Sequence, residues 1–174
     1  YQGIYANRKE KYSRIFTFWK FELPLIFRRH HRVFLFTAAI FILFVTIGYL
    51  SSAYNPEFVR GVLGDDYVDM TEENIANGDP FGVYKDNSPF NMFMRIAFNN
   101  IRVSFLTFMG GFTLGYFTLS LMWSNGIMLG SFQYLFFSHG LGAQSILVIW
   151  IHGTIEISSI IVAGAAGFVL ANGI

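Results

Sequence analysis

Two ionisable residues inside an apolar stretch are the clearest candidates for chemistry in this sequence. His152 and Glu156 lie within the run from Ile149 to Leu170, and a spacing of four places them on one face of a helix, one turn apart. As a helix the run would be about 33 Å long, enough to cross the roughly 30 Å of hydrocarbon in a bilayer. Because ionisable groups are costly inside a bilayer, we expect this pair to face other protein or water.

Two interpretations of the pair stay open. In the first, His152 and Glu156 hydrogen-bond to each other or to a neighbouring helix, and so fix the register in which helices pack. In the second, Glu156 carries a proton or an ion and His152 tunes it. Three amide side chains would then line the polar path: Asn99, Asn100 and Asn125.

Small residues continue along the same helix face beyond the pair. Ser159, Ala163 and Gly167 follow one another at spacings of four, the pattern that lets helices approach closely in lipid. Gly130, which precedes Ser131 in another apolar run, is interpreted in the same way. These residues predict helix packing and carry no catalytic chemistry of their own.

Recognised catalytic patterns are absent from the sequence. It contains no HExxH zinc pattern, no GxSxG nucleophile pattern, and no P-loop or dinucleotide-binding glycines. A catalytic zinc needs three protein ligands; His152 and Glu156 would supply two, and His139 would have to supply the third. No catalytic residue, metal ligand or cofactor is therefore predicted, and an intramembrane metalloenzyme ranks as the third hypothesis.

The composition is typical of a membrane protein. Of the 174 residues, 53% are hydrophobic and 13% are charged, and the mean hydropathy is +0.45, whereas soluble domains carry about 25% charged residues. The absence of cysteine excludes disulfides and thiolate metal sites. Eight of the twelve Lys and Arg residues precede Val33, and eight of the eleven Asp and Glu residues lie between Glu57 and Asp86. This asymmetry separates a basic segment from an acidic one.

Residues 1–32 are expected to form a basic amphipathic segment at the cytoplasmic membrane interface, because basic and aromatic residues alternate there in a helical rhythm. Pro24 is expected to kink or end this helix. Arg28, Arg29 and Arg32 directly precede an apolar run. We therefore interpret them as a topology signal and a contact for anionic lipid, in preference to a nucleic-acid site.

The apolar run 33–54 predicts a transmembrane helix that leads from the cytoplasm outward. Residues 55–89 would then form an acidic extracytoplasmic segment, which Asn55 and the proline after it separate from the span. Within this segment Thr71 is predicted to cap a short helix, and the alternating stretch before it is compatible with a strand. The aspartates lack EF-hand spacing, so the segment is interpreted as a surface for partner proteins.

The remainder, 90–174, is expected to form a membrane bundle. Its predicted parts are an amphipathic helix 90–108, a span 105–123, a short segment 126–139 and a long helix 143–171. A dozen apolar residues reach only about 18 Å as a helix, so the short segment is predicted to be half-membrane or re-entrant. The predicted fold class is an all-α polytopic membrane protein with interfacial amphipathic helices, an acidic outer segment and this half-membrane segment.

Several stretches resemble a known family. They are AFNNIRVSFLTFMGGFTLG, SNGIMLGSFQYLFFSHG and IWIHGTIEISSIIVAGAAGFVL, with Asn125-Gly126 before Gly130 and the His-Gly-x-x-Glu-Ile run from His152 as their most telling pieces. Together they resemble the stage II sporulation protein M (SpoIIM) family. The stretch LGDDYVDMTEENI, followed by NGDP, is similar to the branch in non-sporulating Bacteroidota. Members usually carry further helices, so the chain is expected to be a fragment of a longer protein.

The resemblance implies a polytopic protein of the bacterial inner membrane that helps to assemble or localise peptidoglycan-degrading partners. We therefore expect a multi-pass, non-enzymatic scaffold of a cell-envelope complex, with residues 1–32 cytoplasmic and 55–89 periplasmic. The alternative is a proton- or ion-coupled transporter that uses His152 and Glu156. The expected partners are the lipid bilayer, other membrane or envelope proteins and further copies of the chain, without nucleic acid.

Overall fold

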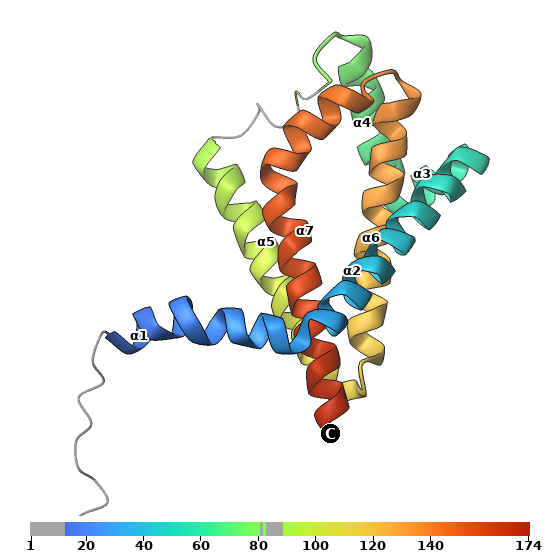
Figure 1. Ribbon diagram of the computed structural model, residues 1–174. Coiled ribbons are helices and arrows are strands. Elements are labelled where there is room, and N and C mark those ends of the chain that lie inside the picture. The colour runs from blue at the N-terminus through green and yellow to red at the C-terminus, as the bar shows by residue number, and fades with distance from the viewer. Residues whose placement is uncertain (1–12, 81, 83–88) are drawn as a thin grey trace, which may run out of the picture.

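The computed structural model describes residues 13–80, 82 and 89–174, and within these it leaves the side chains of 13, 89, 92 and 148–152 undescribed. Every regular element in the described part is helical (Figure 1), which confirms the all-α fold class. Two stretches are long and apolar enough to cross a membrane, Arg14–Tyr54 and Gly153–Gly173. Residues 1–12 of the predicted basic segment, and 81 and 83–88 of the acidic one, lie outside the described residues.

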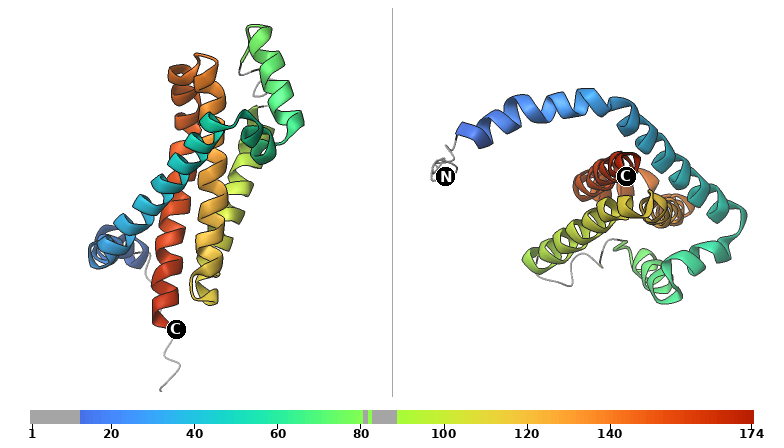
Figure 2. Two further views of the ribbon diagram at one scale, coloured as in Figure 1. Left: turned by 90° about the vertical axis from the view of Figure 1, so that its right-hand side faces the viewer. Right: turned by 90° about the horizontal axis from the view of Figure 1, so that it is seen from below.

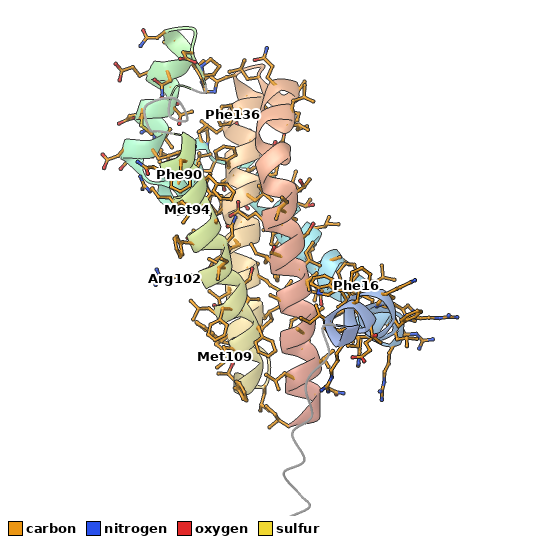
Figure 3. All side chains as sticks on the ribbon, turned by 90° about the vertical axis from the view of Figure 1, so that its left-hand side faces the viewer. Phe16, Phe90, Met94, Arg102, Met109 and Phe136 are labelled. Carbon is orange, nitrogen blue, oxygen red and sulfur yellow. The ribbon has the colours of Figure 1, made fainter. Side chains whose placement is uncertain are left out.

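An N-terminal arm projects sideways from the lower part of the bundle in Figure 1, and the chain then turns and runs along the bundle (Figures 1 and 2). The arm consists of α1 (Ser13–Thr17), the π-helix η1 (Phe18–Glu22) and the start of α2 (Leu23–Tyr54). The chain turns at His30, where φ −108° and ψ 17° depart from helical values. The large side chains of the arm are exposed, for example Trp19 at 65% and Phe16 at 77%, the latter labelled in Figure 3. This is the geometry expected of an interfacial amphipathic helix.

The predicted effect of Pro24 is corrected. The helix neither ends nor kinks there, because the π-helical turn precedes the proline: the N–H of Leu23 donates to the carbonyl of Phe18. A proline inside an α-helix clashes with the carbonyl four residues earlier, and a wider turn relieves this clash. The bend lies six residues later, at His30.

Two short helices, α3 (Pro56–Leu63) and α4 (Asp65–Ala76), follow α2. Asn55 ends α2 and begins α3, since its side chain accepts a hydrogen bond of 3.1 Å from the N–H of Glu57. The prediction that Thr71 caps a helix is wrong: α4 begins at Asp65, and the Thr71 hydroxyl donates to the carbonyl of Tyr67 inside it. The stretch that was compatible with a strand forms this helix instead.

Three helices complete the bundle: α5 (Pro89–Met109), α6 (Tyr116–Ser138) and α7 (Gly142–Gly173). The 3₁₀ turn η3 (Gly110–Thr113), with Leu114 and Gly115 at positive φ, reverses the chain between α5 and α6. The bounds of α5 and α7 lie close to those predicted for 90–108 and 143–171.

The predicted span 105–123 and half-membrane segment 126–139 are corrected. The chain reverses at η3, and α6 continues through Asn125 and Gly126 without a break, so 126–139 is the second half of α6. Asn125 does not interrupt the helix because its Nδ2 donates to the carbonyl of Leu121, 2.8 Å away, within the same helix. At 23 residues, α6 is about 34 Å long.

The core lies where α2, α6 and α7 meet. Phe41 and Phe44 from α2, Met122 from α6 and Ile160 from α7 form its buried cluster. A second, smaller cluster joins Val59 of α3 and Val68 of α4 to Leu135 near the end of α6. The α3–α4 pair is therefore docked on the bundle by apolar contacts.

Candidate functional site in the bundle

Glu156 lies inside the bundle beside a cavity of about 360 Å³. The cavity opens between α2, α3, α4, α6 and α7, and most of its lining is apolar. Apart from Glu156, the lining residues are Phe41, Val62, Leu63, Tyr67, Asn125, Met128, Leu129, Phe132, Gly153, Ile157 and Ile160. Volumes of this order are typical of small-ligand pockets. The predicted intramembrane acid is thus partly buried against protein.

Two of the three predicted asparagines lie with Glu156. Asn125 lines the same cavity from α6, and the side chain of Asn100 on α5 hydrogen-bonds to the Glu156 carboxyl. Asn100 Oδ1 is buried and has no hydrogen-bond partner among the described residues. Asn99, one position earlier on α5, is exposed and does not join the group. The polar group therefore draws one residue from each of three helices.

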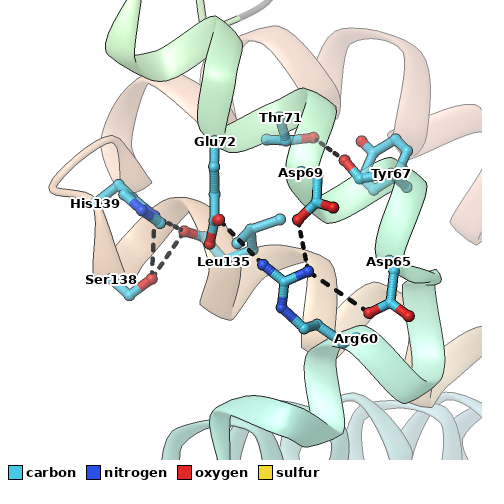
Figure 4. Close-up of polar contacts among 9 residues, drawn as sticks. All are labelled: Arg60, Asp65, Tyr67, Asp69, Thr71, Glu72, Leu135, Ser138 and His139. Carbon is cyan, nitrogen blue, oxygen red and sulfur yellow. Dashed lines mark hydrogen bonds and ion pairs between the residues drawn. The ribbon is translucent and has the colours of Figure 1, made fainter.

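The predicted contact between His152 and Glu156 stays a prediction. The backbone of His152 belongs to α7, one turn before Glu156, but its side chain lies outside the described residues. His139, the third ligand of the zinc hypothesis, caps the end of α6, where its Nδ1 lies 2.8 Å from the carbonyl of Leu135 (Figure 4). His139 lies just before α7, which begins at Gly142. Glu156 lies roughly 20 Å further along the axis of α7, so His139 is far from Glu156.

The α2–α6 interface is built from small residues on both helices. A Cβ on Gly130 would collide with the carbonyl oxygen of Val45, and a Cβ on Gly48 would lie 2.5 Å from the carbonyl oxygen of Ile127. Between the helices the hydroxyls of Ser52 and Ser131 are hydrogen-bonded, 3.0 Å apart, and both residues are fully buried. Backbone therefore packs directly against backbone along this interface.

Helix packing at Gly130 was predicted from the sequence, whereas packing at Gly48 and Ser52 was not. Gly48 and Ser52 are nevertheless four residues apart, as are Gly126 and Gly130. This is the same spacing of small residues that predicts helix packing along α7. A Cβ on Gly126 would lie 2.6 Å from the Cβ of Phe44. Small residues four apart in both apolar runs therefore indicate that these two helices pack against each other.

The small-residue face of α7 is tightly packed against other helices at Gly167, and less tightly at Ser159, which lies nearer to Glu156. A Cβ on Gly167 would lie 2.7 Å from the hydroxyl of Thr118 and 2.9 Å from the carbonyl of Thr107. Ala163 is buried, at 9% exposed. Ser159 is partly buried, and its hydroxyl donates within its own helix to the carbonyl of Ile155. Gly167 thus makes the interhelical contact to α5 and α6.

An arginine holds the α3–α4 pair together at the end of the bundle (Figure 4). Arg60 on α3 donates to Asp69 at 2.6 Å and to Glu72 at 3.2 Å, and lies 3.5 Å from Asp65. Its hydrogen bond to Asp69 raises the pKa of Arg60 above its ordinary value. These contacts fix α4 relative to α3.

The predicted lipid-contacting arginines lie at the elbow between the arm and the bundle. Arg28, Arg29 and Arg32 are all exposed, and they flank His30, where α2 bends. Within the described part of the chain, no ion pair joins them to a carboxylate. Their positive charges are therefore free to interact with anionic groups outside the described part of the chain.

One comparison identifies the chain. The family model "SpoIIM: Stage II sporulation protein M" matches residues 37–174, a range that contains the cavity, the α2–α6 interface and the α3–α4 pair. No curated protein and no solved structure matches. Because the family model covers most of the chain, the protein belongs to the stage II sporulation protein M family.

Proposed function

We propose that this protein is a multi-pass scaffold of the bacterial inner membrane that holds envelope proteins together, with residues 1–32 cytoplasmic and 55–89 periplasmic. In this proposal it carries out no catalysis. The partners are peptidoglycan-processing proteins, as the family resemblance implies. The observation that carries the proposal is the attachment of the acidic α3–α4 pair to the bundle by apolar contacts, and of α4 to α3 by ion pairs.

That attachment has two parts. Val59 and Val68 are buried against Leu135 of α6, and Arg60 forms ion pairs with the three carboxylates that face it. A surface held in this way presents charges to a partner at fixed positions, so binding does not have to order it first.

Three exposed carboxylates remain without an ion pair in the described structure: Glu57, Asp66 and Glu73. They supply the charge that would attract a basic surface on a partner and accelerate its association. Since they lie on α3 and α4, the partner would bind at the end of the bundle opposite the arm (Figure 2).

The test is affinity purification of the full chain from native membranes, followed by an assay of peptidoglycan hydrolysis in the eluate. We expect hydrolytic activity to co-purify, and Glu73→Lys to lower it severalfold while the protein stays folded. Glu22→Lys, the same charge reversal on the arm, serves as the control and should leave the yield unchanged. Absence of hydrolytic activity from the wild-type eluate would contradict the scaffold proposal.

A proton- or ion-coupled transporter is the second candidate, and the cavity beside Glu156 favours it. A carboxyl group and the Asn125 amide at an otherwise apolar cavity would suit a small cation or a proton. Glu156→Gln separates the two candidates, because glutamine keeps the size and can still hydrogen-bond to Asn100.

A scaffold predicts that Glu156→Gln leaves both folding and co-purification unchanged. A transporter predicts that the same variant folds but loses flux in reconstituted vesicles, measured with a pH-sensitive dye or a radiolabelled cation. Asn99→Asp, a change at an exposed position beside Asn100, is the control for effects of polarity alone.

A further inference from the structure

A second cavity, separate from the Glu156 cavity, lies at the elbow of the N-terminal arm. Its volume is about 440 Å³. It is a groove between the first turns of α2, the end of α5 and the last turns of α7. The lining residues are Leu23, Ile26, Phe27, His30, Phe34, Phe108, Val162, Ala165, Ala166, Val169 and Leu170. Apart from His30, every one of them is apolar.

The bend at His30 opens this groove. Before the bend the arm runs away from the bundle, and after it α2 runs along the bundle, so the two directions diverge beside the end of α7 (Figures 1 and 2). Ala165 and Ala166 contribute only methyl groups to the wall on the α7 side. The wedge between the helices is therefore left unfilled by the chain.

The groove and a cluster of positive charge occur at the same place. Arg28, Arg29 and Arg32 lie within two residues of His30, which itself lines the groove. All three are exposed and form no ion pair with a described carboxylate. An occupant that satisfies both features has an apolar chain attached to an anionic group.

We propose that the groove binds one anionic phospholipid, with an acyl chain against Ala166 and Phe34 and the phosphate near Arg28, Arg29 and Arg32. An interfacial helix lies at the depth of the headgroups, so the elbow is where a headgroup and the start of its acyl chain meet. Arginine suits the phosphate because its planar donors can form paired hydrogen bonds. Charge alone would attract anionic lipid anywhere along the arm, whereas the groove restricts it to one site.

The experiment uses the full chain in lipid nanodiscs with spin-labelled phosphatidylglycerol or phosphatidylcholine as the probe. Electron paramagnetic resonance measures how much of each lipid is immobilised. We expect the wild type to prefer phosphatidylglycerol by about fivefold or more. The variant Arg28→Gln/Arg29→Gln/Arg32→Gln should bring this preference close to one, and Arg102→Gln, a change on α5, should not.

A second variant tests the groove itself. Ala166→Phe would fill the groove from an exposed position on α7, and should abolish the immobilised phosphatidylglycerol while the protein keeps its melting temperature. Ala39→Phe, at an exposed position of α2 outside the groove, is the matched control and should retain the lipid. Equal immobilisation of the two lipids by the wild type would overturn the proposal, as would folded Ala166→Phe protein that retains phosphatidylglycerol.

Discussion

Helix α6 has two sides that differ in how they are packed. Towards α2, Gly126 and Gly130 bring the two backbones into contact, and Ser131 hydrogen-bonds across the interface. Towards α7, a cavity of about 360 Å³ is lined by Leu129 of α6 and Glu156 of α7. We infer from this difference that the α2–α6 interface stabilises the bundle. The side of α6 that faces the cavity can accommodate a larger side chain or a ligand.

In the proposed multi-pass arrangement the α2–α6 interface lies in the membrane, which would account for the small residues on this side of α6. Lipid tails are as apolar as leucine, so helices in a bilayer associate through van der Waals contact and hydrogen bonds more than through exclusion of water. A void forfeits those contacts. Stability should therefore depend mainly on the α2–α6 interface, and three substitutions test this.

Gly130→Ala is expected to have the largest effect. Its new Cβ would collide with backbone atoms of Val45 and Tyr49, which cannot move aside as a flexible side chain could. We expect a loss of about 2 kcal/mol or more in the free energy of unfolding, measured as a lower melting temperature in detergent. The control is Gly61→Ala on α3, where nothing lies within 4 Å of the added Cβ; it should be neutral or stabilising by up to about 1 kcal/mol. Equal melting temperatures for Gly130→Ala and Gly61→Ala would show that the close α2–α6 contact at Gly130 does not determine stability.

Leu129→Phe tests the cavity side of the same helix. The larger side chain would enter the cavity rather than a filled core, so the free energy of unfolding should stay the same or rise by up to about 1 kcal/mol. Thermal unfolding in the same detergent measures it. A loss as large as that of Gly130→Ala would mean that the cavity is filled in the membrane.

Ser131→Ala is expected to have the smallest effect, although it removes the hydrogen bond between the Ser52 and Ser131 hydroxyls that spans the interface. Interhelical hydrogen bonds in membranes contribute about 0.6 kcal/mol on average. Ser52 also keeps its second bond, to the carbonyl of Gly48, 2.8 Å away. Chemical unfolding of Ser131→Ala and Ser52→Ala, singly and together, would give the coupling free energy. A value near zero would assign the stability of the interface to packing alone.

The helix bounds were predictable where apolar periodicity and a strong terminator coincide. Asn55 with the following proline ends α2, and the long apolar run of α7 was identified nearly to its ends. The continuity of α6 was not predictable from residue type, because Asn125 and Gly126 are common in turns. Here the Asn125 amide bonds within its own helix and Gly126 faces Phe44.

The candidate site was predicted in part for a similar reason. An acid in an apolar run already indicates a polar partner, and the sequence placed Asn100 and Asn125 with Glu156. Spacing along α5 could not tell Asn99 from Asn100, since only the rotation of α5 against α7 decides which one faces inward. The cavity depends on five helices at once, so no local pattern encodes it.

A disulfide between α2 and α6 tests most directly whether the bundle acts as a rigid scaffold. The 174-residue sequence has no cysteine, so Ser52→Cys/Ser131→Cys introduces the only two thiols within it, at positions whose hydroxyls lie 3.0 Å apart. We predict near-complete cross-linking in native membranes, undiminished co-purification of peptidoglycan hydrolysis, and no cross-link in the control pair Ser52→Cys/Ser120→Cys. Failure of the first pair to cross-link, or loss of the co-purified activity only in the oxidised protein, would contradict the account.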